Sequence, residues 1–271
     1  MRSDPDVRLQ ACLASGSTMR VLVVVAHPDD EVLGCGALLA RLDDVRVVHV
    51  TDGAPRNGAD ARRHGFATPA DYAAARTREA GAALRVASKE ADRLSSLGVP
   101  DQEVSLRLAD VARRLVPAME GADLVLTHAF EGGHGDHDAV AFAVHAAAGR
   151  LVPSERPKLV EMPFYHAAPD GWRRQVFLPQ GGAGPERVLE LDAALRELKA
   201  RMVAAHVSQA DTLRSFDNTA ERFRVAPTYD FTARPHGGDL LYERHGWNLD
   251  WPGWLAHVAA AEAELAREDA A

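Results

Sequence analysis

A histidine and three carboxylates stand together near the start of the chain, where His27-Pro28-Asp29-Asp30-Glu31 follows the apolar run 21–26. A second cluster, residues 131–138, consists of Glu-Gly-Gly-His-Gly-Asp-His-Asp. Two histidines and one carboxylate are a ligand set that suits catalytic zinc, which keeps a fourth position open for water. Such a site lowers the pKa of water and polarises a carbonyl group. The two clusters therefore predict metal-assisted chemistry.

The spacing within the clusters suggests a role for each group. His27 and Asp30 flank a tight turn and can point at one centre, which either His134 or His137 would complete. The spare carboxylate, Asp29, can take a proton from water. The spare histidine can stabilise an oxyanion or protonate a leaving amine.

Each cluster also has a purely structural interpretation. Asp29 and Asp30 can cap the helix that follows them and interact with its positive end. His134 and His137, taken alone, can be exposed loop residues. The location of both clusters at strand ends of one predicted sheet favours the metal site.

The elements that must position these residues alternate between strand and helix patterns as far as residue 165. The expected strands are 21–26, 45–50, 91–97, 123–127 and 159–165, and the expected helices are 31–41, 71–86, 103–116, 137–151, 191–209 and 251–268. This alternation predicts an α/β fold with a Rossmann-like, mostly parallel sheet and helices on both faces. The first and fourth strands of such a sheet are often neighbours, so the two clusters are expected to meet at its carboxyl edge.

Composition and charge narrow the class of protein. The chain has 271 residues and a net charge of −8, with no run of basic residues, which argues against nucleic acid as a partner. No apolar run approaches the roughly 20 residues that span a bilayer, so no membrane partner is expected. Cys12 and Cys35 are too few for a disulfide scaffold, and we expect a reducing, cytoplasmic location.

The domain organisation is predicted to be simple. Residues 1–18 are polar, lack the apolar centre of a signal peptide and are expected to form an N-terminal extension, with Met19 as an alternative start. Residues 19–271 are expected to form a single α/β domain with C-terminal decoration from about residue 210. The sequence does not indicate an oligomeric state.

The motifs of this chain resemble those of the LmbE-like, or PIG-L, family of zinc-dependent de-N-acetylases. Ala26–Glu31 matches the AHPDDE motif of the family, and His134–His137 matches its HPDH motif, with Gly135 in place of proline. Weaker matches follow in the family order: 51–53 (TDG), 76–79 (R-x-x-E), 97–101 (LGVPD) and 206–209 (H-x-SQ) with Lys199 upstream. Proline would stiffen the loop, so the departure at Gly135 concerns its rigidity and not its ligands.

The resemblance implies roles for particular residues. It assigns three metal ligands: His27, Asp30 and His137. The metal would be Zn²⁺, with Fe²⁺ as an alternative. By the same resemblance Asp29 acts as general base, His134 faces the carbonyl oxygen, and Asp136 orients His134.

Candidate substrate contacts are also taken from the resemblance. Arg76 and Asp101 match contacts to the sugar, although either could be a surface charge. His206 is a third candidate, with a packed core histidine as its alternative. Of the three tryptophans near the C-terminus, Trp247, Trp251 and Trp254, the last two are expected to pack a terminal helix on the core, and stacking on a sugar or aglycone is the alternative.

The function predicted first is zinc-dependent hydrolysis of an N-acetyl group from an N-acetylglucosamine-type conjugate, which gives a free amine and acetate. The partner would be a small amino-sugar molecule. Two alternatives remain at this stage. Two histidines and one carboxylate also form the ligand set of non-haem iron oxygenases. The same fold could equally serve a non-catalytic module that binds a sugar or a nucleotide.

Overall fold

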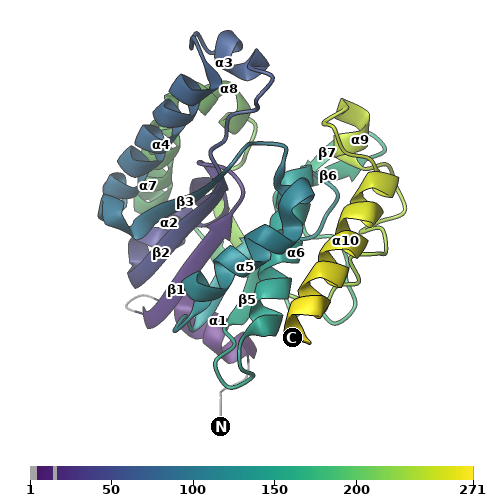
Figure 1. Cartoon of the computed structure of the whole chain (residues 1–271). Helices are drawn as coiled ribbons and strands as arrows, with labels where there is room; N and C mark the ends of the chain where they lie inside the picture. Colours follow the sequence, from purple (N-terminus) through teal and green to yellow (C-terminus); the bar gives the residue numbers. More distant parts are fainter. Residues whose placement is uncertain (1–4, 15–16, 271) are drawn as a thin grey trace.

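A seven-stranded sheet lies between two layers of helices in the computed structural model, which describes residues 5–14 and 17–270 (Figure 1). The strand order is β3-β2-β1-β4-β5-β9-β8, and β6 and β7 form a separate two-stranded hairpin. The strands are β1 (Ser17–Val25), β2 (Leu42–Thr51), β3 (Leu94–Val99), β4 (Leu124–His128), β5 (Lys158–Met162), β6 (Tyr165–Ala168), β7 (Gly171–Arg174), β8 (Arg187–Glu190) and β9 (Ala220–Val225). Strands β1 to β5 run parallel, whereas β9 pairs antiparallel with β5 and β8. The predicted α/β class with a mostly parallel sheet is confirmed.

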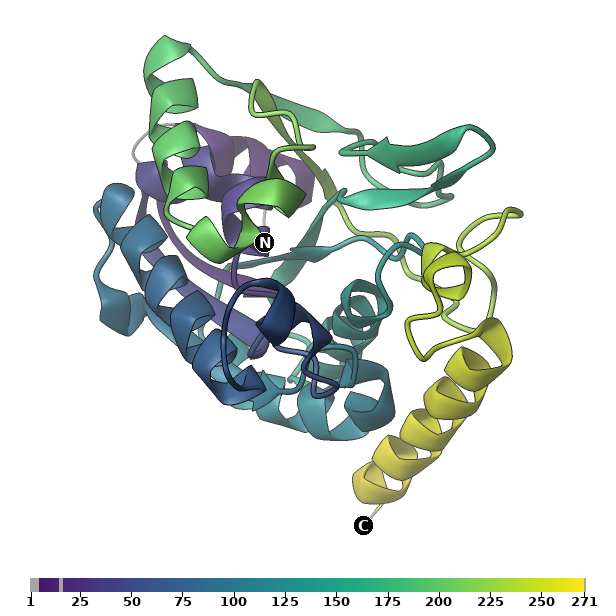
Figure 2. The same cartoon turned by 90° about the horizontal axis from the view of Figure 1, so that it is seen from above.

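Helices cover both faces of this sheet, as expected. They are α1 (Pro5–Leu13), α2 (Asp30–Arg41), α3 (Ala59–Arg63), α4 (Pro69–Val86), α5 (Leu108–Met119), α6 (Gly135–Arg150), α7 (Ala193–Ala204), α8 (Ala210–Leu213), α9 (Leu241–His245) and α10 (Trp251–Asp269). One apolar core joins the sheet to α5, α6 and α10, and a second joins it to α1, α2, α4 and α7. Figure 1 and Figure 2 show these two groups of helices on opposite sides of the strands.

Several element boundaries differ from the predictions, each for a local reason. β1 begins at Ser17 instead of Val21, because Ser17 still pairs with Leu42 of β2. β5 ends at Met162, since Pro163 follows and cannot donate to a ladder. The helix predicted for 191–209 ends at Ala204, and a 3₁₀ turn occupies 207–209.

The predicted N-terminal extension contains a packed helix. Leu9 and Cys12 of α1 are fully buried, and α1 lies against β1 and β9. Asp6 accepts hydrogen bonds from the guanidinium group of Arg187 in β8. Residues 1–4 and 15–16 of the expected extension lie outside the described residues. No helix in the described part of the chain is both long and apolar enough to cross a membrane.

A buried ion pair fixes the helix that follows the first cluster. Helix α2 is kinked at Cys35, where φ is −147°. The backbone amides of Ala37 and Leu38 donate to the carboxylate of Glu221 in β9, at 2.7 and 3.0 Å. The ammonium group of Lys199 in α7 donates to the same carboxylate at 2.8 Å, with both side chains fully buried. This ion pair holds α2 against β9 and α7. Lys199, the lysine of the last family motif, therefore has a structural role.

Candidate metal centre and active site

The strand order brings the two sequence clusters together. β4 pairs directly with β1, so the carboxyl ends of these two strands are adjacent. The first cluster leaves β1 and enters α2 at Asp30, and the second leaves β4 and enters α6 at Gly135. Both helices therefore begin at the edge of the sheet where parallel α/β proteins bind their ligands.

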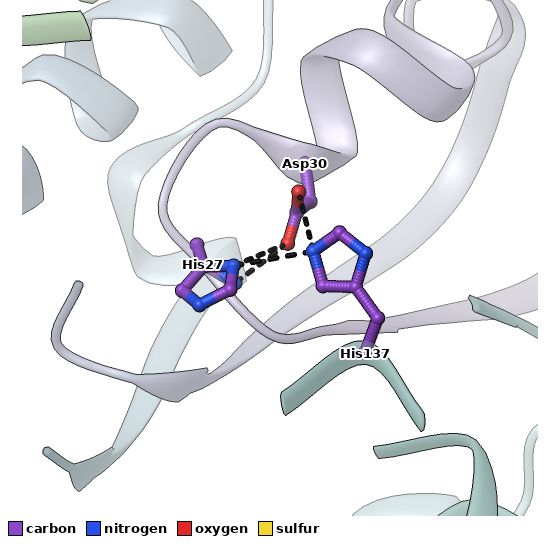
Figure 3. Close-up of side chains that lie close together, drawn as sticks. All are labelled: His27, Asp30 and His137. Atoms are coloured by element: carbon purple, nitrogen blue, oxygen red, sulfur yellow. Dashed lines mark hydrogen bonds and ion pairs between the residues drawn. The ribbon is translucent and has the colours of Figure 1, made fainter. Parts of the chain in front are cut away.

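The three predicted metal ligands converge, as Figure 3 shows. His27 Nδ1 lies 3.2 Å from Asp30 Oδ2 and 3.3 Å from His137 Nε2, and His137 Nε2 lies 3.4 Å from Asp30 Oδ1. Ligand atoms about 2.0–2.2 Å from a tetrahedral zinc ion stand roughly 3.3–3.6 Å apart. The three side chains are buried. Their donor atoms therefore fit one divalent metal ion with a coordination position left for water or substrate.

Carboxylates around His27 make the centre suitable for a cation. On the far side of the ring, His27 Nε2 lies 3.2 Å from Asp101 Oδ1 and 3.4 Å from Asp136 Oδ2. Burial disfavours charge on His27, but the surrounding carboxylates outweigh burial and raise its pKa well above the usual value. Burial likewise disfavours charge on Asp30, yet His137 and His27 hold its pKa well below the usual value. A carboxylate beside the distal nitrogen is also the usual way to orient a metal-binding histidine.

Asp136 does not hold His134 through its carboxylate. That carboxylate accepts the backbone amides of Gln102 and Val104, at 2.6 and 3.0 Å, and faces His27. The backbone amide of Asp136 instead donates to His134 Nδ1 at 3.1 Å. With Nδ1 as an acceptor, a neutral His134 carries its hydrogen on Nε2. Burial and nearby His27 lower the pKa of His134 to about 4, which favours this neutral donor.

A second group of possible ligands shares His27 with His134 and Asp136. It suits a metal less well than the first group. His134 has its Nε2 protonated when Nδ1 accepts an amide, and the carboxylate of Asp136 is already engaged by two backbone donors. The first group is therefore the better candidate for a metal site.

Asp29 lies beside the metal ligands in a strained backbone conformation. Its φ is 149°, which is unusual for a residue with a side chain and costs about 1–3 kcal/mol. Its amide donates to Glu31 Oε2 at 3.2 Å, and its carboxylate accepts from Arg76 Nη2 at 2.8 Å. Arg76 also donates to the carbonyl oxygens of Pro28 and Gly53. Burial raises the pKa of Asp29 to about 7, although Arg76 acts in the opposite direction, and a base of that strength is useful near neutral pH.

A fourth histidine beside this group, His128, was not among the residues predicted from the sequence, because it follows the strand expected for 123–127. His128 is the last residue of β4 and is fully buried. Its Nε2 accepts the backbone amide of Ala26 at 2.8 Å and lies 3.5 Å from Asp30 Oδ2. Its ring stacks on that of His137, with centroids 4.0 Å apart and planes 15° apart. Its position directly after an apolar strand was the available signal.

His128→Phe is expected to weaken metal binding by about 10–100-fold, the usual effect of losing a group that orients a ligand. Phenylalanine keeps a ring against His137 but leaves the buried amide of Ala26 without its acceptor. A competition titration with a chromophoric chelator measures the change. His145→Phe, which alters a histidine of α6 outside the site, is the control. Equal affinity in wild type and His128→Phe would show that His128 does not position the ligands.

Two of the three predicted substrate contacts line the pocket above the metal group, and the third does not. Arg76 and Asp101 border a cavity of about 480 Å³ together with the metal ligands. Asp101 Oδ1 also faces His27, so this residue contacts one of the three candidate metal ligands. His206 is fully buried and is absent from the pocket lining, and burial lowers its pKa. Its alternative interpretation as a packed core histidine agrees with this location.

The outer wall of the pocket comes mostly from residues for which the sequence predicted no strand or helix, together with Tyr165 at the end of the strand expected for 159–165. The β6–β7 hairpin and α9 lie side by side at one rim (Figure 1 and Figure 2), and α3 and α8 contribute elsewhere. The lining residues from these segments and the loops after them include Asp60, Arg63, Tyr165, Trp172, Asp211 and Trp247. Of these, only Trp247 was considered from the sequence.

Comparisons with known proteins show which proteins this chain is similar to. Residues 22–148, which include both clusters, match the family model PIG-L, described as GlcNAc-PI de-N-acetylase. A probable N-acetyl-α-D-glucosaminyl L-malate deacetylase 2 of Bacillus subtilis (strain 168) is 30% identical over 150 residues, which cover 52% of this chain and 66% of that protein, just under two thirds of its length.

Two solved structures support the fold. A deacetylase of the teicoplanin biosynthesis pathway has a TM-score of 0.61 and 21% identity, over 78% of this chain and 99% of the other. The zinc-inhibited form of teicoplanin deacetylase has a TM-score of 0.59 and 20% identity over the same shares. At these identities the likeness concerns the α/β architecture.

Proposed function

The chain belongs to the PIG-L family through residues 22–148, and we propose that it is a metal-dependent hydrolase that removes the N-acetyl group from an N-acetylglucosamine-type conjugate. One observation carries this proposal. A three-residue metal group, a separate buried carboxylate at Asp29 and a neutral donor at His134 border the same pocket. A protein that only binds a sugar has no need for this combination.

The residues divide the chemistry between them. His27, Asp30 and His137 would hold the metal, which when bound supplies Lewis acidity to the carbonyl group and acidifies water. Asp29 takes a proton from the water that attacks the carbonyl carbon. His134 Nε2 donates to the carbonyl oxygen as negative charge develops there. The carbon–nitrogen bond then breaks, and the proton held by Asp29 passes to the leaving amine, which gives acetate and a free amine.

Arg76 has a positioning role in this scheme. It contacts the carboxylate of Asp29 and the carbonyl oxygens of Pro28 and Gly53, so it holds the strained turn in place. Asp101 lies between His27 and Arg76, 4.0 Å from the guanidinium group. A hydroxyl or charged substituent of the sugar that enters the pocket would meet these two side chains first.

Zinc is the first candidate metal and ferrous iron the alternative, because imidazole and carboxylate ligands suit both. One structural neighbour is named as a zinc-inhibited form. For that reason a metal titration of this protein should start below one equivalent of metal per protein molecule. The cytoplasmic location and the small-molecule partner remain predictions from the sequence.

The deciding experiment measures amine release from a panel of N-acetylglucosamine conjugates by purified protein, before and after chelation. Release that chelation abolishes and that Zn²⁺ or Fe²⁺ restores would support the proposal. Absence of release from every conjugate, by protein with metal bound, would contradict it. Dioxygen uptake with Fe²⁺ and a 2-oxo acid would instead indicate the oxygenase alternative.

A further inference from the structure

A C-terminal segment, residues 235–249, covers the loop of the second cluster. The backbone amide of Leu241 donates to the carbonyl oxygen of Gly132 at 2.8 Å. A Cβ atom at Gly132 would lie 2.6 Å from Leu240 Cδ2, and one at Gly135 would lie 2.8 Å from Leu249 Cδ2. The side chain of Leu249 therefore fills the space beside residue 135, where the family has proline. Glycine at position 135, where the family has proline, therefore allows the side chain of Leu249 to pack at this place.

This segment carries Trp247 into the pocket next to His134. The two ring centroids are 4.8 Å apart, with the planes at 40°. Trp247 stacks on His245 at 4.7 Å and 17°, and His245 meets the edge of Trp172 in the β6–β7 hairpin. Trp247 thus packs between the rings of His134 and His245, and the hairpin reaches it only through His245. It lines the pocket and is partly exposed.

The position of Trp247 indicates which end of the substrate it borders. In the proposed function, which this step rests on, His134 donates to the carbonyl oxygen. The amine side of the amide leads to the sugar, toward Arg76 and Asp101, which are 4.0 Å apart. The acyl side leaves the carbonyl carbon in the other direction. Asp101 Oδ1 lies 3.9 Å from His134 Nε2, and Trp247 packs against the same imidazole ring, so both border this donor. With the sugar on the side of Arg76 and Asp101, we take the side that Trp247 borders as the acyl side.

We propose that Trp247 limits the size of the acyl group and makes the enzyme selective for N-acetyl over longer N-acyl substrates. The indole packs on the ring of His134, the proposed donor to the carbonyl oxygen, so it borders the acyl group, leaves room for a methyl group and excludes a propyl chain. A difference of one methylene in an apolar pocket changes the specificity constant by roughly 10–200-fold. Two added methylenes should therefore be strongly rejected.

The test compares N-acetyl-, N-propionyl- and N-butyrylglucosamine conjugates that carry the same aglycone. We expect the wild type to prefer acetyl to butyryl by at least about 100-fold in kcat/KM. Trp247→Ala should reduce that ratio to below about 10-fold, chiefly through faster cleavage of the butyryl substrate. Trp247→Phe should fall between them, since phenylalanine fills part of the same space.

Trp251→Ala is the matched control, because Trp251 lies outside this pocket at the start of α10. It should keep the wild-type ratio. If the wild type releases amine and Trp247→Ala keeps the wild-type acetyl-to-butyryl ratio of kcat/KM, the size limit is overturned but the proposed function is not. Equal loss of activity on all three substrates overturns it as well and assigns Trp247 a general role in shaping the site. No release by the wild type from any substrate overturns the proposed function first.

Discussion

Asp29→Asn is expected to lower kcat/KM for amine release by about 10²–10⁴-fold, while metal affinity stays within a few-fold of wild type. Asparagine has almost the same shape and can still accept the hydrogen bond from Arg76, but it cannot take a proton. Asp29 is not one of the three converging ligands, so the metal group keeps its donors. Asparagine is also among the residues that tolerate positive φ best, which limits the effect on the strained turn.

The measurement pairs steady-state amine release with a metal titration of the same preparation. Asp110→Asn makes the same chemical change at a half-exposed residue of α5 that pairs with Arg114 and does not line the pocket, and it should leave both values at wild type. Near-normal turnover in Asp29→Asn would place the general base elsewhere. Loss of metal together with activity would show instead that Asp29 belongs to the ligand set.

The fold could be predicted because its central strands are continuous apolar runs. Residues 21–25 are buried on both faces of the sheet, so the run itself indicated a parallel strand. Boundaries were less predictable, because partners distant in sequence decide them. β1 starts early through its pairing with Leu42, and β5 stops where Pro163 removes a donor.

The metal group was accessible from sequence because its two clusters follow strands that a doubly wound sheet makes neighbours. The hydrogen-bond and ion-pair partners of these residues could not be predicted from the sequence. Whether Asp101 faces a sugar or His27 depends on how the segment after β3 returns toward β1, and no local pattern encodes that path. The role of His206 stayed open for a similar reason, since the same helical pattern suits a pocket wall and a core.

A glycine of the third motif shows what structure adds to resemblance. Gly53 has a φ of +68°, and a Cβ there would lie 2.5 Å from Arg76 Nη1. The resemblance matched residues 51–53 to a family motif but gave no physical reason for the glycine. Its glycine lets the guanidinium group of Arg76 pass close to the backbone and reach Asp29. The turn therefore positions Arg76 against Asp29, the proposed general base.

His137→Ala is expected to abolish the stabilisation that metal gives to the folded protein. At a free metal concentration of about 1,000 times Kd, binding adds about 4 kcal/mol to the free energy of unfolding. In a protein of this size that raises Tm by roughly 10 °C. The variant should gain less than about 2 °C at the same concentration, because one of three donors is gone. Alanine favours helix in the first turn of α6, so the metal-free protein should fold normally.

Thermal unfolding with and without metal measures this effect without any substrate. His145→Ala makes the same substitution further along α6, outside the site, and should keep the full rise in Tm. A full rise in His137→Ala would mean that the metal is held by other donors. The group of His27, His134 and Asp136 would then be the first to examine. His134→Ala separates the two arrangements, because it removes a ligand only from the second of them, and in the arrangement proposed here it should slow amine release while the rise in Tm persists.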